Sequence, residues 1–293
     1  MANLDLIKKL RDMTQAGVMD AKKALEENND NLDEAAQWLR EKGIVKAAKK
    51  ASAVATEGLV KIKINEDKAL IIEINSQTDF VAMSDKFIKL GNDVTEAIFL
   101  ANPTSLQDAL KVKVTDGHSV EEICTELTAR IGEKIAVRRF EIIHKKSDEL
   151  FAHYVHSNNK IAVLLLMNSN SDEKVGHDVA MHAAAMNPKF LSENDIDQAW
   201  LVNETKILKE QTISEGKPAD KAEMIVKGRV KKMLAEVCLL NQQFFKDPSQ
   251  TIDEFLKSKN SSISKYIRYE VGEGIEKKVD DFAAEVAAQM KLN

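Results

Sequence analysis

The side chains that most often carry out chemistry are sparse in this chain of 293 residues, and their spacing does not bring them together. His153 and His156 are three residues apart on a predicted strand, and because strand side chains alternate between faces, their rings point in opposite directions. His177 and His182, five residues apart on a predicted helix, also diverge. Neither pair suits zinc, which needs ligands that converge. The sequence therefore predicts no metal site.

Motifs for covalent catalysis or phosphate binding are missing as well. The chain has neither the Gly-x-Ser-x-Gly pattern of a nucleophilic serine nor the glycine-rich patterns that cradle phosphates. Glu73 and Asp79 could be imagined as an acid–base pair, but both lie near one strand end, which defines no separation between them. Residues 272–274 (Gly-Glu-Gly) are typical of a structural turn. We expect no catalysis by the chain's own side chains and no cofactor.

The most informative stretch is residues 78–82, with the sequence Thr-Asp-Phe-Val-Ala. An apolar strand over 70–74 runs into it, and Thr78 is a good N-cap for a helix that starts there. Asp79 then lies where the helix dipole favours negative charge. Phe80 is the next residue on the first turn, where an aromatic side chain can insert into a pocket of another protein. The alternative is that Phe80 packs inward, as large apolar residues mostly do.

The composition narrows the class of protein. The formal net charge is −5, so the chain as a whole has no basic surface for nucleic acid, and direct nucleic-acid binding is not expected. Cys124 and Cys238 are widely separated, which fits a reducing compartment rather than a disulfide framework. The chain opens without a signal-peptide pattern, and no apolar run approaches the ~18 residues of a membrane span. We expect a soluble, cytoplasmic protein that makes no membrane contact.

Residues 1–55 are predicted to form a small module of three short helices and a linker. Each helix has its own apolar stripe: Leu4, Ile7 and Leu10; then Val18, Ala21, Ala24 and Leu25; then Leu32, Ala35, Ala36 and Leu39. Asn31 can cap the third helix with Glu34 as its capping-box partner, and Gly43 can end it. The lysine-rich run 46–50 is either an RNA-binding patch or a solvated helix face, and the acidic total favours the second.

A faint internal repeat organises the centre of the chain. Residues 59–76 and 150–169 each read as a strand, a polar turn and a second strand that ends in Asn-Ser, followed by a helical pattern. Later lone strands are predicted at 135–140 and 266–271. Two such β-β-α···β units give small antiparallel sheets with helices on one face, which is an α+β fold with a core of two subdomains.

Further helical segments complete the predicted layout. Ser192 or Asn194 can start a helix that runs to about Ser214, and Gly216 and Pro218 then break it. A return helix makes this a hairpin that either projects or lies flat on the core. Thr251 and Glu254 form a capping box before the last strand. The predicted domains are residues 1–55, residues 56–147, residues 148–279 with the hairpin inserted at 193–237, and a C-terminal helix in 280–293.

Four segments of the chain resemble signatures of the bacterial elongation factor Ts family. Residues 10–25 (LRDMTQAGVMDAKKAL) resemble its N-terminal signature, and residues 75–82 (NSQTDFVA) resemble the second. Residues 271–277 (VGEGIEK) and 281–288 (DFAAEVAA) are similar to two later segments, and all four occur in the family's order. The resemblance implies a ubiquitin-associated-like N-terminal module, a two-subdomain core and, as in the long form of the family, a protruding coiled-coil arm.

The resemblance also implies a function. It predicts a guanine-nucleotide exchange factor that binds GDP-bound and nucleotide-free elongation factor Tu. The factor would promote GDP release by displacing elements around the Mg²⁺ and phosphate sites, without binding the nucleotide itself. The alternatives are an RNA- or ribosome-associated module without exchange activity, and an enzyme with an uncharted α+β site. The implied partner-binding residues are Thr78, Asp79, Phe80 and Val81; Arg11, Val18, Met19 and Lys22; His182; Phe244 and Phe245; and Phe282.

Several positions depart from the family pattern or leave alternatives open. Gln15 stands where glycine is usual and Val18 where methionine is usual, so the shape of the N-terminal contact is expected to differ. Ala21 replaces a frequent cysteine, which removes a thiol at little cost to the fold. His182 is either a residue of the partner surface or a helix histidine satisfied within the chain. The pattern around Phe244 is only weakly matched.

Overall fold

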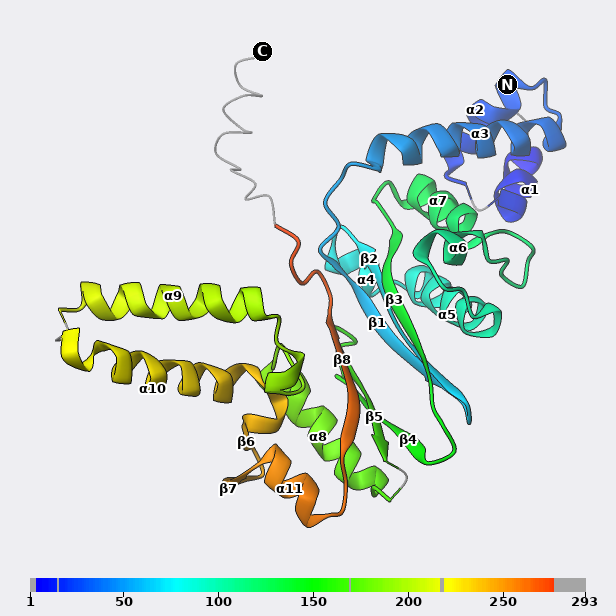
Figure 1. The fold of residues 1–293 in the computed structure, drawn as a ribbon. Coiled ribbons are helices and arrows are strands. Elements are labelled where there is room, and N and C mark those ends of the chain that lie inside the picture. The colour runs from blue at the N-terminus through cyan, green and yellow to red at the C-terminus, as the bar shows by residue number, and fades with distance from the viewer. Residues whose placement is uncertain (1–3, 15, 169, 217–218, 277–293) are drawn as a thin grey trace. The chain divides into compact units, whose positions relative to one another are not determined.

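The computed structural model describes residues 4–14, 16–168, 170–216 and 219–276 (Figure 1). The chain divides into two compact parts. The first comprises Met1–Lys61, Ile72–Glu141 and Glu270–Asn293, and the second comprises Ile62–Ile71 and Ile142–Tyr269. The predicted C-terminal helix, with Phe282, lies outside the described residues. In the part of the chain that the structure describes, no helix is both long and apolar enough to cross a membrane.

The chain begins with the three predicted helices, α1 (Leu4–Thr14), α2 (Val18–Glu27) and α3 (Leu32–Lys50). Their small core consists of buried residues from all three helices: Ile7, Leu10, Ala21, Ala24, Leu25 and Ala35. Two residues of the predicted stripes lie outside this core, because Leu4 is 81% and Val18 51% exposed. We call α1–α3 the three-helix module.

The third helix begins at the predicted Asn31 cap, without the reciprocal Glu34 side-chain bond of the predicted capping box among its cap contacts, and it ends later than predicted. The Asn31 side chain accepts hydrogen bonds from the backbone N–H groups of Asp33 and Glu34. The prediction that Gly43 ends this helix is wrong, because α3 continues through it to Lys50. Gly43 instead lies close to α7 (Val120–Ile131), where an added Cβ would come within 3.2 Å of the Ala129 Cβ. Glycine here therefore allows a close helix approach rather than a helix end, and the lysines at 46–50 lie on an exposed helix face.

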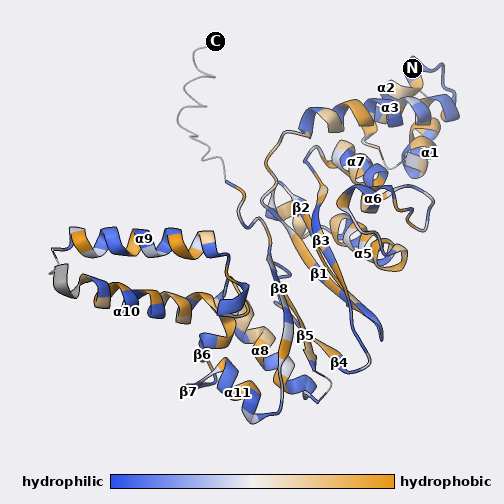
Figure 2. Ribbon diagram, viewed as in Figure 1, coloured by the Kyte–Doolittle hydropathy of each residue, from blue (hydrophilic) through white to orange (hydrophobic). Residues whose placement is uncertain are grey.

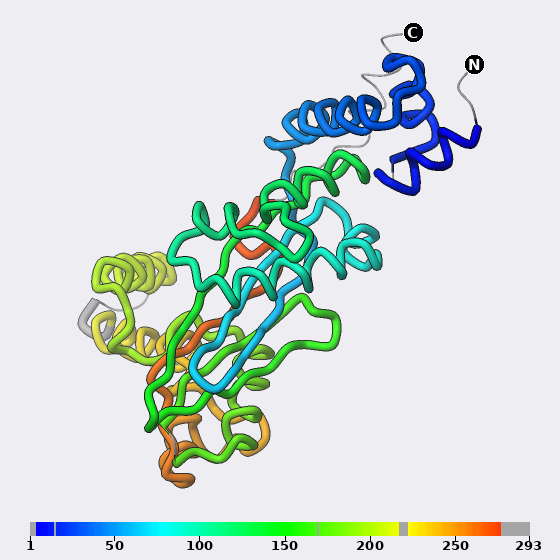
Figure 3. The backbone as a smooth tube through the Cα atoms, turned by 90° about the vertical axis from the view of Figure 1, so that its right-hand side faces the viewer, coloured from blue at the N-terminus to red at the C-terminus, as the bar shows by residue number. Residues whose placement is uncertain are grey.

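The first β-β-α···β unit forms a three-stranded sheet in the order β1-β2-β3. Its strands are β1 (Glu57–Ile64), β2 (Lys68–Ser76) and β3 (Ala136–His144). Between β2 and β3 the chain forms α4 (Asp79–Ala82), α5 (Asp85–Ala101), α6 (Leu106–Lys111) and α7 (Val120–Ile131). Figure 3 shows α5–α7 in front of the strands. Strand β2 is buried along nearly its whole length, so it is the centre of this layer in packing as well as in order.

The second β-β-α···β unit repeats this topology in the order β4-β5-β8. Its strands are β4 (Glu149–Val155), β5 (Ile161–Asn168) and β8 (Ile263–Glu270), with α8 (Glu173–Met186) after β5. Strands β4 and β5 are antiparallel, with Ala152 opposite Leu165. Helix α8 approaches closely at Gly176, where an added Cβ would collide with the Ala152 side chain. The predicted repeat and the α+β fold class are therefore confirmed.

Between α8 and β8 the chain inserts a helical hairpin and a small sheet. The hairpin consists of α9 (Gln198–Ser214) and α10 (Ala219–Val237), preceded by the 3₁₀ turn η1 (Glu193–Asp195). The prediction that α9 starts at Ser192 or Asn194 is wrong, because Ser192 caps η1 and Asp197 caps α9. Figures 1 and 2 show α9 and α10 extending side by side away from α8, with apolar and polar residues interspersed along both. The hairpin therefore does not lie flat on its own unit.

After the hairpin come η2 (Leu239–Asn241), a short antiparallel pair, β6 (Gln243–Phe244) and β7 (Asp247–Thr251), and α11 (Ile252–Ser258). The predicted capping box of α11 is confirmed, because the Thr251 hydroxyl accepts from the Glu254 N–H and the Glu254 carboxylate accepts from the Thr251 N–H. The pair β6–β7 is too short to be recognised from residue alternation. It holds Phe244 in the core beneath α8.

Candidate functional site

The sequence 78–82 forms a four-residue helix, α4, that presents one aromatic side chain outward. Thr78 is the N-cap, and its hydroxyl accepts from the Val81 N–H at 3.4 Å. Val81 and Ala82 are each 8% exposed and anchor the inner face of α4. Phe80 is 80% exposed, so the alternative that Phe80 packs inward is wrong. Met83, three residues on, is 65% exposed. The buried inner side of α4 therefore supports an exposed outer side on which Phe80 and Met83 lie beside Asp79.

A second capping residue, Ser84, ends α4 after four residues. The Ser84 hydroxyl donates to the Val81 carbonyl at 2.7 Å and accepts from the Phe87 N–H at 3.4 Å. Ser84 thus closes α4 and opens α5, whose Phe87 is fully buried. Within α4, the Phe80 N–H donates to a carboxylate oxygen of its neighbour Asp79 at 2.9 Å. Asp79 itself is exposed, in keeping with its predicted place at the surface.

One residue that holds α4 has no signal in the sequence. The Glu133 carboxylate, from the loop between α7 and β3, accepts from the Thr78 N–H at 3.0 Å and from the Thr78 hydroxyl at 2.8 Å. Beside it, the Lys134 N–H donates to the Gln77 side-chain oxygen at 2.9 Å. These contacts join residues 55 and 57 positions apart in the chain, and no local pattern indicates them.

The second acidic residue noted in the sequence, Glu73, is not poised for acid–base chemistry. Its carboxylate is fully buried and accepts from Arg138 at 2.9 Å, from Arg139 at 2.6 Å and from the Gly272 N–H at 2.8 Å. Burial alone would raise the pKa of Glu73, but these hydrogen bonds outweigh it and lower the pKa below its ordinary value. Glu73 therefore stays ionised and ties residues 270–273 to β2. The glycine turn is structural, as expected.

The predicted contact residues in the second unit are mostly buried. His182 is 0% and Phe244 3% exposed, whereas Phe245 is 42% exposed. His182 Nε2 lies 2.9 Å from the Gln242 side-chain oxygen, and the Phe245 N–H donates to His182 Nδ1 at 3.3 Å. Burial lowers the pKa of His182, so the ring is neutral at pH 7. His182 is therefore a buried helix histidine whose ring nitrogens bond within the chain, and not an exposed residue of a partner surface.

Phe244 and Phe245 belong to one aromatic cluster with different exposures. The Phe244 ring stacks on Phe255 with centroids 4.4 Å apart, and the Phe245 ring stacks on His182 at 5.8 Å. The predicted partner role therefore lacks an exposed side chain at His182 and Phe244, and of these three predicted contact residues Phe245 is the exposed one. We call His182, Phe244, Phe245 and Phe255 the aromatic cluster.

The predicted contact residues of the three-helix module are all exposed. Arg11, Val18 and Lys22 lie at its surface, and Met19 is 74% exposed. Arg11 and Val18 line a groove of about 500 Å³ together with Leu4 of α1 and Lys86 of α5. The Arg11 Nε donates to the Ala16 carbonyl at 3.3 Å, which holds the α1–α2 turn. These side chains are placed for a partner contact, and the contact itself stays a prediction.

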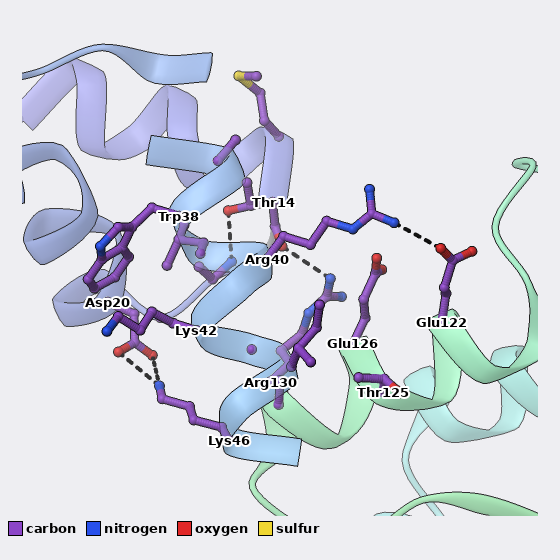
Figure 4. A pocket seen from close by; sticks show the side chains of 18 of the residues that line it. Thr14, Asp20, Trp38, Arg40, Lys42, Lys46, Glu122, Thr125, Glu126 and Arg130 are labelled. Atoms are coloured by element: carbon purple, nitrogen blue, oxygen red, sulfur yellow. Dashed lines mark hydrogen bonds and ion pairs between the residues drawn. The ribbon is translucent and has the colours of Figure 1, made fainter. Parts of the chain in front are cut away.

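A larger groove of about 790 Å³ lies between the three-helix module and α7 (Figure 4). Arg40 reaches Glu122 across it at 3.1 Å, and Arg130 donates to the Thr14 carbonyl at 3.1 Å. The hydrogen bonds of the Ser119 capping box hold the pKa of Glu122 down at about 2. Exposed pairs of this kind are screened by solvent and contribute little to stability. Weak, exposed contacts therefore join the three-helix module to α7 across this groove.

The described part of the chain contains no candidate metal site, and its two cysteines are buried. No group of three or more His, Cys, Asp or Glu side chains among the described residues could hold a metal ion. Both cysteines are free and buried, and burial raises the pKa of Cys124 to about 12 and that of Cys238 to about 11. These thiols are therefore protonated at pH 7 and are poor nucleophiles.

The exposed Phe80 on its capped helix is suited to contact with another protein, and a comparison with known families identifies the family of the chain. A family model described as elongation factor TS matches residues 77–273, more than half of the chain. The match begins at the turn that caps α4 and ends just after β8. Members of this family are nucleotide exchange factors for elongation factor Tu in translation elongation. The chain belongs to the elongation factor Ts family.

Proposed function

We propose that this chain binds elongation factor Tu and accelerates GDP release by inserting Phe80 beside the Mg²⁺ and phosphate sites of the partner. The observation that carries the proposal is the 80% exposure of a phenylalanine held on a capped, inwardly anchored helix. An exposed aromatic on rigid backbone loses little conformational entropy on binding, which is why such residues dominate many interfaces.

The exchange requires no contact between this chain and the nucleotide. The factor needs only to bind more tightly to the conformation of the partner in which the Mg²⁺ and phosphate ligands are displaced. By linkage, the factor and GDP then weaken each other's binding by the same factor. A coupling of about 4 kcal/mol corresponds to roughly a thousandfold in affinity. The factor therefore binds both the GDP-bound and the nucleotide-free partner, and the second more tightly.

The residues of α4 have separate roles in this proposal. Phe80 supplies the displacement, and Asp79 orients the junction by hydrogen bonding to the partner. Thr78 and Val81 act from within the chain, Thr78 as the cap and Val81 as the buried anchor. Met83 extends the apolar face of α4 and is a further contact candidate that the sequence did not suggest.

Other surfaces would hold the two proteins together while Phe80 acts. The three-helix module would contact the nucleotide-binding domain of the partner through Arg11, Val18, Met19 and Lys22, all of which are exposed. Phe245 would contact a second partner domain, and Phe282 would add a contact from the C-terminal segment. Because these residues bind rather than displace, their loss should raise the concentration needed for half-maximal exchange and leave the maximal rate unchanged.

The test is release of a fluorescent GDP analogue from elongation factor Tu, followed with the wild-type chain and with Phe80→Ala. Leu100→Ala is the matched control, because Leu100 is also an exposed apolar residue of the same unit, 69% exposed at the far end of α5. We expect fast release with wild type and Leu100→Ala and slow release with Phe80→Ala. Absence of acceleration by the wild type would refute the exchange function.

A second arm of the same experiment tests the mechanism. Release is repeated after Mg²⁺ has been removed with a chelator, so that the displacement attributed to Phe80 has already occurred. The difference between wild type and Phe80→Ala should then shrink. An undiminished difference would mean that Phe80 acts elsewhere than at the Mg²⁺ site, even though exchange itself is intact.

A further inference from the structure

We propose that Glu133 is a positioning residue for exchange: its carboxylate fixes the cap of α4 and thereby the direction in which Phe80 points. This inference rests on the proposed function, because it assigns a role to Glu133 through Phe80. It concerns a residue 53 positions away from Phe80 in the chain, outside the signature that contains the phenylalanine. We call the contacts between residues 77–78 and 133–134 the latch.

The need for a latch arises from the length of α4. A helix of four residues has one turn, and a single turn is unstable alone because nucleation fixes several dihedral angles for one hydrogen bond. Its backbone bonds are few: Ala82 N–H to the Thr78 carbonyl at 3.2 Å and Met83 N–H to the Asp79 carbonyl at 3.0 Å. The orientation of Phe80 is therefore set by the buried Val81 and Ala82 on the inner face of α4 and by contacts at its ends.

Glu133 makes those contacts at the N-terminal end. It accepts two hydrogen bonds from one residue, the Thr78 N–H and the Thr78 hydroxyl, in a half-buried position. Because the hydroxyl hydrogen points to Glu133, an oxygen lone pair is left to accept from the Val81 N–H. The carboxylate thus selects the hydroxyl orientation that caps the helix. Bonds to an ionised acceptor are roughly twice as strong as neutral ones.

The loop that carries Glu133 is itself held in place. Helix α7 ends at Gly132, whose φ of +85° is the left-handed conformation that glycine adopts most easily. The Thr128 carbonyl accepts from the Gly132 N–H at 2.8 Å, and the Thr128 hydroxyl accepts from the Ile135 N–H at 3.0 Å. One residue of α7 therefore fixes both ends of the loop, and Glu133 is placed before it meets Thr78.

A neutral bond beside Glu133 completes the latch. The Lys134 N–H donates to the Gln77 side chain, so the two residues before α4 are each bonded to the loop. Gln77 precedes the cap, where the direction of the chain between β2 and α4 is set. The geometry therefore makes the loop between α7 and β3 a rigid support for α4.

The first test measures the latch directly in the free protein. Amide hydrogen exchange at Thr78 and Val81 is compared in wild type, Glu133→Ala and Glu133→Gln, with Glu66→Ala as the control. Glu66 is an exposed carboxylate in the turn between β1 and β2. We expect exchange at both amides to be about tenfold faster in Glu133→Ala, equivalent to about 1.4 kcal/mol, and unchanged in Glu66→Ala. Unchanged exchange in Glu133→Ala would overturn the latch.

The second test asks whether the latch acts through Phe80. At saturating factor, Glu133→Ala should lower the maximal GDP release rate about tenfold while the half-saturating concentration stays within about twofold. Glu133→Gln, which keeps one acceptor oxygen, should recover part of the loss. In a Phe80→Ala background, Glu133→Ala should have no further effect, because interacting positions are not additive.

The outcomes separate the two proposals. No acceleration by the wild type removes the exchange function, whatever Glu133 does to amide exchange. Slow release by Phe80→Ala together with a normal maximal rate for Glu133→Ala keeps the function and overturns the positioning role. An additive loss in the double variant also overturns it, because Glu133 would then act by a route other than Phe80. Thr78→Val, which removes the hydroxyl alone, provides the same comparison if Glu133→Ala fails to fold.

Discussion

The two β-β-α···β units have the same strand order and differ in the segment that comes after the second strand. In the first unit the chain leaves β2 and forms the short helix α4 before the long helix α5, and Phe80 on α4 is 80% exposed. In the second unit β5 leads to α8 with Asp172 as its cap, and the nearby aromatic Phe244 is 3% exposed. The first unit thus exposes Phe80, whereas the second buries Phe244.

The difference shows that topology alone does not decide where a partner can bind. In both units the second strand and the helix that follows it help to form the core. The second strand of each, β2 or β5, buries a row of apolar residues. In the first unit, additional residues between β2 and α5 form α4. Thr78 caps α4 and Ser84 caps α5, and this insertion places Phe80 outside the core. We therefore expect exchange to depend on α4 and stability to depend on the aromatic cluster.

The largest expected effect is on stability in the second unit. Phe244→Ala should lower the free energy of unfolding by about 3–5 kcal/mol, because it leaves a cavity beside Phe255. Urea unfolding followed by the fluorescence of Trp200, which packs on Phe190 in the same unit, measures it. Phe80→Ala is the matched control and should cost less than about 0.5 kcal/mol. Similar losses in the two variants would remove the contrast between the units.

A smaller effect on stability is expected in the first unit from Glu73→Gln. Removing this charge takes the buried carboxylate away from Arg138 and Arg139, although Arg139 keeps its pair with Glu273, and should cost about 2–3 kcal/mol at pH 7. Because folding lowers the pKa of Glu73, the folded state binds fewer protons, and the stabilisation is lost as pH falls below the ordinary value of 4.5.

Amide exchange of buried β2 residues at several pH values tests this. The difference between wild type and Glu73→Gln should be constant from pH 7 to 5 and should shrink at lower pH. A difference that stays constant at lower pH would mean that the bonds to Glu73 do not depend on its charge.

The smallest expected effect is a loss of folding stability of the second unit on acidification. This loss should begin at a higher pH than the loss expected for the first unit from Glu73. Burial lowers the pKa of His182, so the unfolded chain takes up a proton below the ordinary value of 6.5 and the folded chain does not. The stability of this unit should therefore fall between pH 7 and 5.5, by about 1 kcal/mol from this residue. In His182→Gln that part of the pH dependence should disappear from Trp200-monitored urea unfolding. An unchanged pH profile would contradict a neutral, buried histidine.

How far the sequence predicts this structure depends on the distance between the residues involved. The strands, the internal repeat and the Thr78 and Thr251 caps rest on neighbours in the chain, and the sequence predicts them. The burial of His182 and Phe244 depends on β6–β7, a pair too short for its alternation to be read.

The two carboxylates that organise the first unit also depend on distant partners. Glu73 meets Arg138 and Gly272, and Glu133 meets Thr78, and these bonds span from 55 to 199 positions. The prediction for Gly43 fails for a related reason, since glycine ends helices and also permits the close approach of another helix.

In the proposed mechanism, α4 drives exchange and the aromatic cluster does not. The most direct measurement is the maximal GDP release rate from elongation factor Tu at saturating concentrations of Phe80→Ala and Phe245→Ala, each checked for native stability. We expect a fall of at least about 30-fold for Phe80→Ala, near 2 kcal/mol, and a rate within about twofold of wild type for Phe245→Ala. A maximal rate for Phe80→Ala equal to wild type, or an equal fall for Phe245→Ala, would contradict it.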